Sequence, residues 1–179
     1  MSTYATAVLI DSDDLDAMTR VLRSVIETAG PGADANTVWA PLLRLGPTTL
    51  RGAIYQPHAQ LDDAAESVLA ALRGGRVAVA DDFDEYGAAF ASWRVDSHTP
   101  RLVYRALICP EDDESLREDS ELPELTGEAA ARRLAALWAA DVERVLAADP
   151  ARPALPEELQ SVAGPFPWWS ALGLAWPSG

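Results

Sequence analysis

Two patterns of hydrophobic and polar residues alternate along this chain. Short apolar runs bounded by polar residues predict β-strands, and longer segments with apolar residues every three or four positions predict amphipathic helices. The clearest helical segment is capped by Ser12 or Asp13 and ends near Ala29, where Gly30 and Pro31 interrupt the pattern. Its apolar stripe consists of Leu15, Met18, Leu22, Val25, Ile26 and Ala29.

The same reasoning assigns the rest of the chain. We expect strands at Tyr4–Ile10, Val38–Leu45, Thr48–Tyr55, Arg76–Ala80, Tyr86–Val95 and Arg101–Cys109. We expect further helices at Leu61–Leu72 and Thr126–Ala148, and two short ones at Pro156–Val162 and Pro167–Trp176. Pro41 lacks a backbone N–H, so the strand that contains it belongs at a sheet edge. The last two strands read as a hairpin.

This order of elements predicts the α+β class, with a mainly antiparallel sheet and helices packed on one face. The order resembles an elaborated ferredoxin-like sandwich. Residues 1–149 would form the domain, and residues 150–179, which hold six of the thirteen prolines and three of the six tryptophans, would be a C-terminal extension packed on it. The segment Pro110–Leu125 contains eight acidic residues and one arginine, so we expect a mobile acidic loop at 110–125.

The composition limits the cellular compartments and the reaction mechanisms that we expect. The 179 residues suffice for one domain with a large core, and the single cysteine, Cys109, cannot form an internal disulfide. The start of the chain lacks the basic residues of a signal peptide, and no apolar run approaches the ~20 residues of a membrane span, so we expect a cytoplasmic protein. All 14 basic residues are arginine. Mechanisms that need a lysine, such as a Walker loop or a Schiff base, are therefore excluded.

The net charge of −14 is concentrated in one part of the sequence. Residues 61–125 carry 16 acids and 6 arginines. Such a surface repels phosphate groups, so neither nucleic acid nor an anionic membrane is an expected partner. One interpretation is a solvated face that keeps the protein soluble, and the other is a surface that attracts a basic protein.

Two apolar strands run directly into aspartates, and this is the strongest enzymatic signal. Asp11 and Asp13 follow the first strand, and Asp81 and Asp82 follow the strand at 76–80. The pair resembles the first and last motifs of haloacid-dehalogenase-type phosphotransferases, which implies an aspartate nucleophile and Mg²⁺ held by carboxylates. The Gly-Thr after the second aspartate is missing, as is the family's lysine. The alternative is a helix cap and a loop.

Other residues give little sign of a catalytic or metal site. Neither His58 nor His98 has a second His or Cys at metal-ligand spacing, so we expect no metal, no cofactor and no catalytic residue. The C-terminal tryptophans, Trp168 and Trp169, have two interpretations. They would either cover apolar surface of the sheet or form an exposed aromatic patch for a partner.

The sequence therefore favours a non-enzymatic protein-binding module that engages a basic partner. An immunity-type inhibitor of a toxic effector would be one concrete form, with carboxylates that mimic a phosphate backbone. The rivals are a small-molecule binder or metal-dependent phosphotransferase-like enzyme that uses the four aspartates, and an assembly subunit that docks through its C-terminal tryptophans. The predicted partner-binding residues are Asp81, Asp82, Asp84, Glu85, Trp168 and Trp169.

Overall fold

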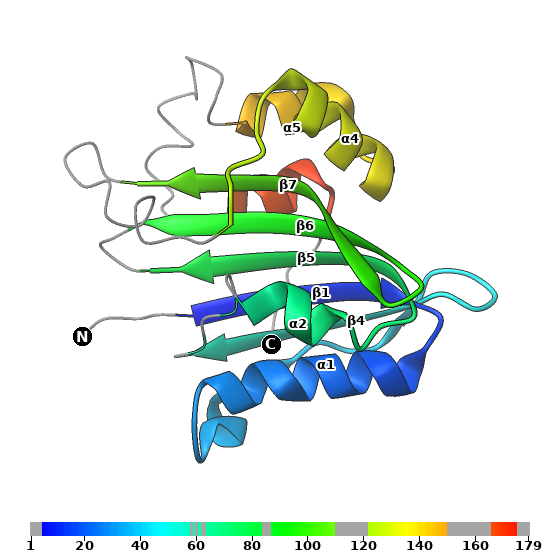
Figure 1. Ribbon diagram of the computed structural model, residues 1–179, viewed down its shortest axis with the longest axis vertical. Helices are drawn as coiled ribbons and strands as arrows, with labels where there is room; N and C mark the ends of the chain where they lie inside the picture. The colour runs from blue at the N-terminus through cyan, green and yellow to red at the C-terminus, as the bar shows by residue number, and fades with distance from the viewer. Residues whose placement is uncertain are drawn as a thin grey trace.

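The computed structural model describes residues 5–57, 59, 61, 64–83, 87–109, 122–149 and 166–174. Within them lie one antiparallel sheet of seven strands and five α-helices, which confirms the α+β class (Figure 1). The strands are β1 (Ala5–Ser12), β2 (Val38–Trp39), β3 (Leu43–Arg44), β4 (Leu50–Pro57), β5 (Gly74–Asp82), β6 (Ala88–Asp96) and β7 (Thr99–Ile108). The helices are α1 (Leu15–Thr28), α2 (Ala65–Leu69), α4 (Glu128–Trp138), α5 (Val142–Ala148) and α7 (Phe166–Ala171), with a 3₁₀ turn, η1 (Ala33–Asn36).

The strand order is β2-β4-β1-β5-β6-β7, with β3 also paired to β4. The first strand thus lies in the interior of the sheet, between β4 and β5. Every pairing among the described strands is antiparallel. The connection β4–α2–β5 is a split βαβ unit of the kind found in ferredoxin-like sandwiches, because β4 and β5 both pair antiparallel with β1, which lies between them.

Helices cover both faces of the sheet, which corrects the expectation of one covered face. On one face α1 and α2 pack against Val8, Ile10 and their neighbours, and on the other α4, α5 and α7 pack against Ala7, Leu9 and theirs. Figure 1 shows α1 beside β4, and α4 and α5 beside β7. The physical reason is visible in β1, whose residues are buried along its whole length. A strand that is apolar without alternation is typical of a sheet covered on both sides.

The predicted long helix at 126–148 is two helices. α4 ends where Ala139 takes a left-handed conformation with φ of 54°. Asp141 then begins α5, because its carboxylate accepts a hydrogen bond from the Glu143 amide at 2.9 Å. The break lets α5 fold back on α4 and complete the apolar layer on this face.

The segment around Pro41 lies at the edge of the sheet, as predicted. The proline separates β2 from β3, and both short strands pair with β4 on the same side. None of the helices in the described part of the chain is long and apolar enough to cross a membrane.

Candidate protein-binding surfaces

Asp11 is a buried structural ion. Its two oxygens accept hydrogen bonds from Arg51 Nε at 2.6 Å, Arg51 Nη2 at 2.8 Å and Arg76 Nε at 2.7 Å. Arg76 Nη1 also donates to the Leu137 carbonyl at the end of α4, at 2.6 Å. The Trp138 ring lies over both guanidinium groups, with its centroid 4.6 Å from Arg76 Cζ. This network fixes the end of α4 to the sheet and occupies the Asp11 carboxylate completely.

Asp81 is also buried, with 2% of the residue exposed, but on the opposite face of the sheet. It accepts hydrogen bonds from the Thr6 hydroxyl and from the Leu61 amide. This placement corrects the expectation that Asp81 belongs to a charged surface. It also separates Asp81 from Asp11, because Asp81 pairs with Thr6 and Asp11 with Arg76. Five residues of strand at about 3.3 Å each place them about 16 Å apart along β1.

The other two aspartates of the phosphotransferase resemblance do not complete a site with these. Asp13 is exposed in the connection before α1, at the Asp11 end of β1. Asp82 is the last residue of β5, at the Asp81 end, and its side chain lies outside the described residues. Antiparallel pairing thus carries the two predicted motifs to opposite ends of the sheet. Within the described residues, no group of three or more His, Cys, Asp and Glu is placed to hold a metal ion.

Five strand ends lie together at one end of the sheet, which we call the acidic end. The register aligns Ala5 with Pro57 and Asp82, Asp82 with Ala88, and Ala88 with Ile108. The chain segments that begin at the ends of β4, β5 and β7, residues 58–64, 82–87 and 109–121, carry twelve acids and one arginine in the sequence. They account for eleven of the fourteen net negative charges. The predicted partner-binding residues Asp84 and Glu85 belong to them and lie outside the described residues.

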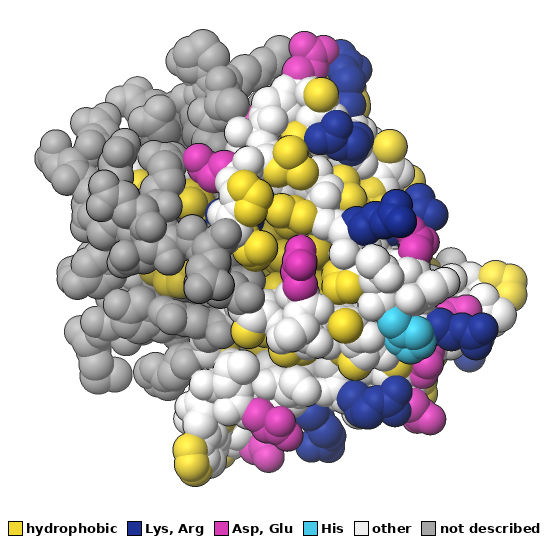
Figure 2. Space-filling view, viewed as in Figure 1, with side chains coloured by type: hydrophobic (Ala, Val, Ile, Leu, Met, Phe, Trp, Pro, Cys, Tyr) yellow, Lys and Arg dark blue, Asp and Glu magenta, His cyan; other side chains and the backbone are white. Residues whose placement is uncertain are grey.

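Arginine side chains gather at the other end of the sheet, where β6 turns into β7. Arg73, Arg94 and Arg101 are exposed there, and Arg94 pairs with Asp96 at 2.9 Å. Figure 2 shows dark blue side chains on this side of the molecule. Asp13, Asp14, Asp16 and Asp96 lie at this same end, so the described residues there carry both signs of charge.

The C-terminal tryptophans belong to the core. Trp168 and Trp169 are 1% and 3% exposed, and the Trp168 ring stacks on Phe90 with centroids 5.2 Å apart. The Trp168 indole donates a hydrogen bond to the Tyr104 hydroxyl at 3.2 Å. These contacts support the interpretation that the segment covers the sheet, and they correct the assignment of both indoles to a partner-binding surface.

A buried polar cluster surrounds Tyr104. Burial raises the pKa of its phenol far above the usual range, and the neighbouring Asp149 carboxylate raises it further. Asp149 also accepts a hydrogen bond from the Gly127 amide at 2.8 Å, just before α4. The cluster ties the strand β7, the start of α4 and the helix α7 together, so its role is structural.

Arg105 is a fully buried cation, and no pattern in the sequence singles it out. Its Nη1 donates to the Leu122 carbonyl at 2.5 Å, and its backbone forms a β-bridge with Leu125. The end of the predicted acidic loop is thus attached to β7. Residues 110–121 of that loop lie outside the described residues.

A solvent-exposed apolar strip occupies the β2/β3 edge, and we call it the apolar edge. Its five large side chains are 40–52% exposed. They are Val38, Trp39, Leu42, Leu43 and Leu45. Among the described residues one other large hydrophobic side chain, Leu15 in the first turn of α1, is exposed to a similar degree. A concentration of this kind is typical of a protein-docking surface.

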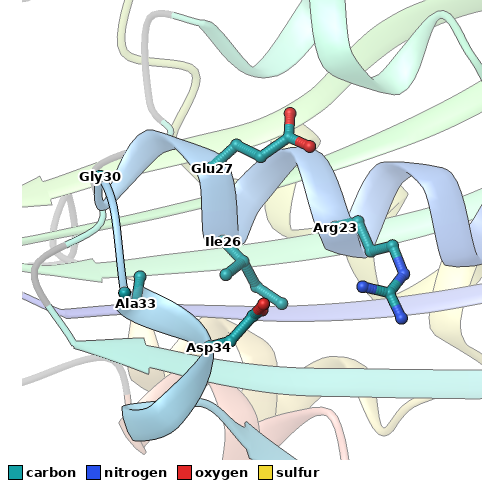
Figure 3. Close-up of a pocket in the computed structure, with 7 residues that line it drawn as sticks. Arg23, Ile26, Glu27, Gly30, Ala33 and Asp34 are labelled. Carbon is teal, nitrogen blue, oxygen red and sulfur yellow. The ribbon is translucent and has the colours of Figure 1, made fainter.

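Two hollows in the described part of the chain do not form a ligand site. One, of about 130 Å³, lies between the end of α1 and η1, and in Figure 3 the Arg23 and Glu27 side chains that line it extend in different directions. The other, of about 380 Å³, is open and lined mainly by Asp13, Asp14 and Asp16. Small-molecule sites are typically 300–1,000 Å³ and lined mostly by apolar side chains, so neither hollow fits that description.

Comparison with protein-family models, with curated proteins and with solved structures finds no match to this chain.

Proposed function

We propose that this protein is a non-enzymatic protein-binding module whose acidic end engages a basic partner protein. The observation that supports this most directly is the convergence of five strand ends at one end of the sheet, where segments with a net charge of −11 begin. An inhibitor that neutralises a toxic nuclease or a similar basic effector is the concrete form that this arrangement favours.

The concentration of carboxylates gives the proposal its mechanism. Segments that carry −11 of the net charge of −14 would attract a basic protein and orient it before contact. Steering of this kind raises association rates by roughly 10- to 1,000-fold over a neutral surface, and salt suppresses it. A basic effector would therefore be captured quickly, as an inhibitor of a toxin requires.

The placement of the aspartates supports binding over catalysis. The Asp11 carboxylate is engaged by Arg51 and Arg76, and Asp81 lies on the other face of the sheet. The phosphotransferase-like alternative needs both carboxylates at one metal ion, and the assembly-subunit alternative needs an exposed Trp168 or Trp169. The positions of these side chains therefore favour neither the phosphotransferase-like enzyme nor the assembly subunit.

The test is to isolate the partner by pull-down and then measure its association rate against ionic strength. A triple variant, Asp82→Asn, Asp84→Asn and Glu85→Gln, should slow association with little change in the dissociation rate. Raising salt from 0.15 M to 1 M should also slow it, because the Debye length falls from about 8 Å to about 3 Å.

The matched control is a second triple variant with the same change in net charge. Asp13→Asn, Asp16→Asn and Asp96→Asn remove three exposed carboxylates at the opposite end of the sheet, where β1 and β6 end. This variant should bind almost as fast as the wild type. An acidic partner, or equal slowing by the two triple variants, would refute a localised electrostatic site.

A further inference from the structure

The apolar edge is a second surface, and its chemistry differs from that of the acidic end. Residues 33–57, which include the edge and its neighbour β4, contain one acid and two arginines. They are Asp34, Arg44 and Arg51. This stretch therefore carries +1 within a chain of −14. A basic partner gains nothing here, because no acidic cluster accompanies the exposed leucines.

The edge also offers unused backbone. β2 and β3 pair with β4 on one side, and no strand of the described residues pairs with their other side. An open edge that also exposes apolar side chains is a template for another strand. The register places Val38 beside Tyr55 on the α4 face and Trp39 beside Ile54 on the α1 face, so apolar groups project on both sides of the edge. An added strand would therefore find apolar contacts above and below the sheet.

We propose that the apolar edge is a self-association surface, on which a second copy of this chain docks edge to edge and antiparallel. Two copies that each carry −14 repel one another, and the edge adds no repulsion of its own because residues 33–57 carry +1. Antiparallel docking around a two-fold axis is self-complementary, so each copy would cover the five apolar side chains of the other. With the axis at Leu42, next to the Pro41 that interrupts the edge, Leu42 of one copy would face Leu42 of the second.

The proposal goes beyond binding of a basic partner, and salt separates the two. Screening removes the repulsion between two acidic copies, so dimerisation should strengthen as ionic strength rises. Association of the acidic end with a basic protein should weaken over the same range. Failure of either proposal can therefore be recognised without reference to the other.

Sedimentation velocity of the wild-type protein across a concentration series is the first experiment. We expect a monomer–dimer equilibrium whose dissociation constant falls between 0.05 M and 0.5 M salt. Leu43→Glu should weaken dimerisation by about tenfold or more, since it places a carboxylate in the apolar interface. The matched control is Leu15→Glu, an equally exposed leucine outside the edge, which should leave the dissociation constant within about twofold. Circular dichroism of both variants should match the wild type, because both side chains are exposed.

Cross-linking tests the symmetry. In a Cys109→Ser background, Leu42→Cys should form a disulfide-linked dimer under mild oxidation, while Leu15→Cys should not. A wild-type protein that stays monomeric up to about 0.5 mM at both salt concentrations would overturn the proposal. Equal weakening of dimerisation by Leu43→Glu and Leu15→Glu would also overturn it. So would equal cross-linking of Leu42→Cys and Leu15→Cys, which would indicate that the edge docks a different protein.

Discussion

Replacing Asp11 with asparagine is the most direct test of how the fold is held together. The side chain keeps its shape but loses its charge, while Arg51 and Arg76 stay in place. Three N–H groups converge on the two carboxylate oxygens of Asp11. Asparagine offers a single acceptor oxygen and turns an NH₂ group toward guanidinium donors. The variant therefore removes a counter-ion and introduces a donor–donor conflict in the same position.

The expected cost follows from burial. The Asp11 side chain is 2% exposed, and those of Arg51 and Arg76 are 17% and 26% exposed. Removing one partner of a buried ion pair typically costs about 3–5 kcal/mol, because the remaining charge is left without compensation. We expect Asp11→Asn to lose about that much free energy of unfolding, or roughly 10 °C in melting temperature. Urea denaturation followed by tryptophan fluorescence measures this, with exposed Asp13→Asn expected within about 0.5 kcal/mol of the wild type.

A second variant separates the charge effect from packing. Replacing all three members, Asp11→Leu, Arg51→Leu and Arg76→Met, removes the ions together and keeps apolar volume beneath Trp138. Buried ion clusters replaced in this way often lose little stability, so the triple variant should be more stable than Asp11→Asn. Two results would refute this reasoning. One is a loss below 1 kcal/mol for Asp11→Asn, and the other is a triple variant that is less stable than Asp11→Asn. Either would show that Asp11, Arg51 and Arg76 do not depend on one another as a buried network.

Three further predictions concern the core and the buried phenol. Trp168→Ala should cost about 3–5 kcal/mol of unfolding free energy, because it removes a buried indole stacked on the sheet. Gly87→Ala should cost more than about 1 kcal/mol, because Gly87 has φ of 119° and an added Cβ would lie 2.0 Å from the Ile108 carbonyl oxygen. The raised pKa of Tyr104 favours the protonated phenol in the folded state, so its contribution to stability should be complete below pH 10 and decline above it. Tyr104→Phe should remove that decline, as measured by urea denaturation at pH 9 and pH 11.

Controls for these variants come from neighbouring positions. Ser170→Ala changes an exposed residue of the same short helix as Trp168 and should leave stability within about 0.5 kcal/mol. Gly46→Ala adds a Cβ that meets nothing within 4 Å and should be equally mild. If either control matches its test variant in cost, the contact assigned to the test variant is not the cause.

Local pattern was enough to predict most strands, because a strand's apolar run is encoded in adjacent residues. The edge position of the Val38–Leu45 segment also followed from chemistry, since Pro41 cannot donate to a sheet ladder. The division of the helix at 126–148 did not, because Ala139 and Ala140 are strong helix formers. The turn there depends on Trp138, whose indole donates to Ser92 Oγ at 2.9 Å and so fixes where α4 stops. Contacts of that range are not visible in periodicity.

For the candidate site, only the clustering of acidic residues along the chain could be predicted from the sequence. The sequence showed where the acids lie along the chain, but which ends of strands meet depends on pairing order, and Ala5, Asp82 and Ile108 are far apart in sequence. Asp81 shows the opposite error. Its position beside Asp82 in an acidic stretch predicts a surface charge, yet the alternation of β5 turns it inward toward Thr6. The face on which a strand's side chain lies is set by the pairing register, and a one-residue shift in register would move it to the other face.

The interior position of β1 has a consequence for synthesis of the chain. This strand leaves the ribosome before the other described strands, but one of its two partners, β5, ends at Asp82. At 5–20 residues per second, about 4–14 s pass between completion of the two strands. During that interval the apolar run Ala7–Ile10 has only β4 and α1 available to cover it. A nascent chain of this protein is therefore a natural substrate for chaperones that bind short hydrophobic stretches, and a pause in translation before residue 82 would prolong that exposure.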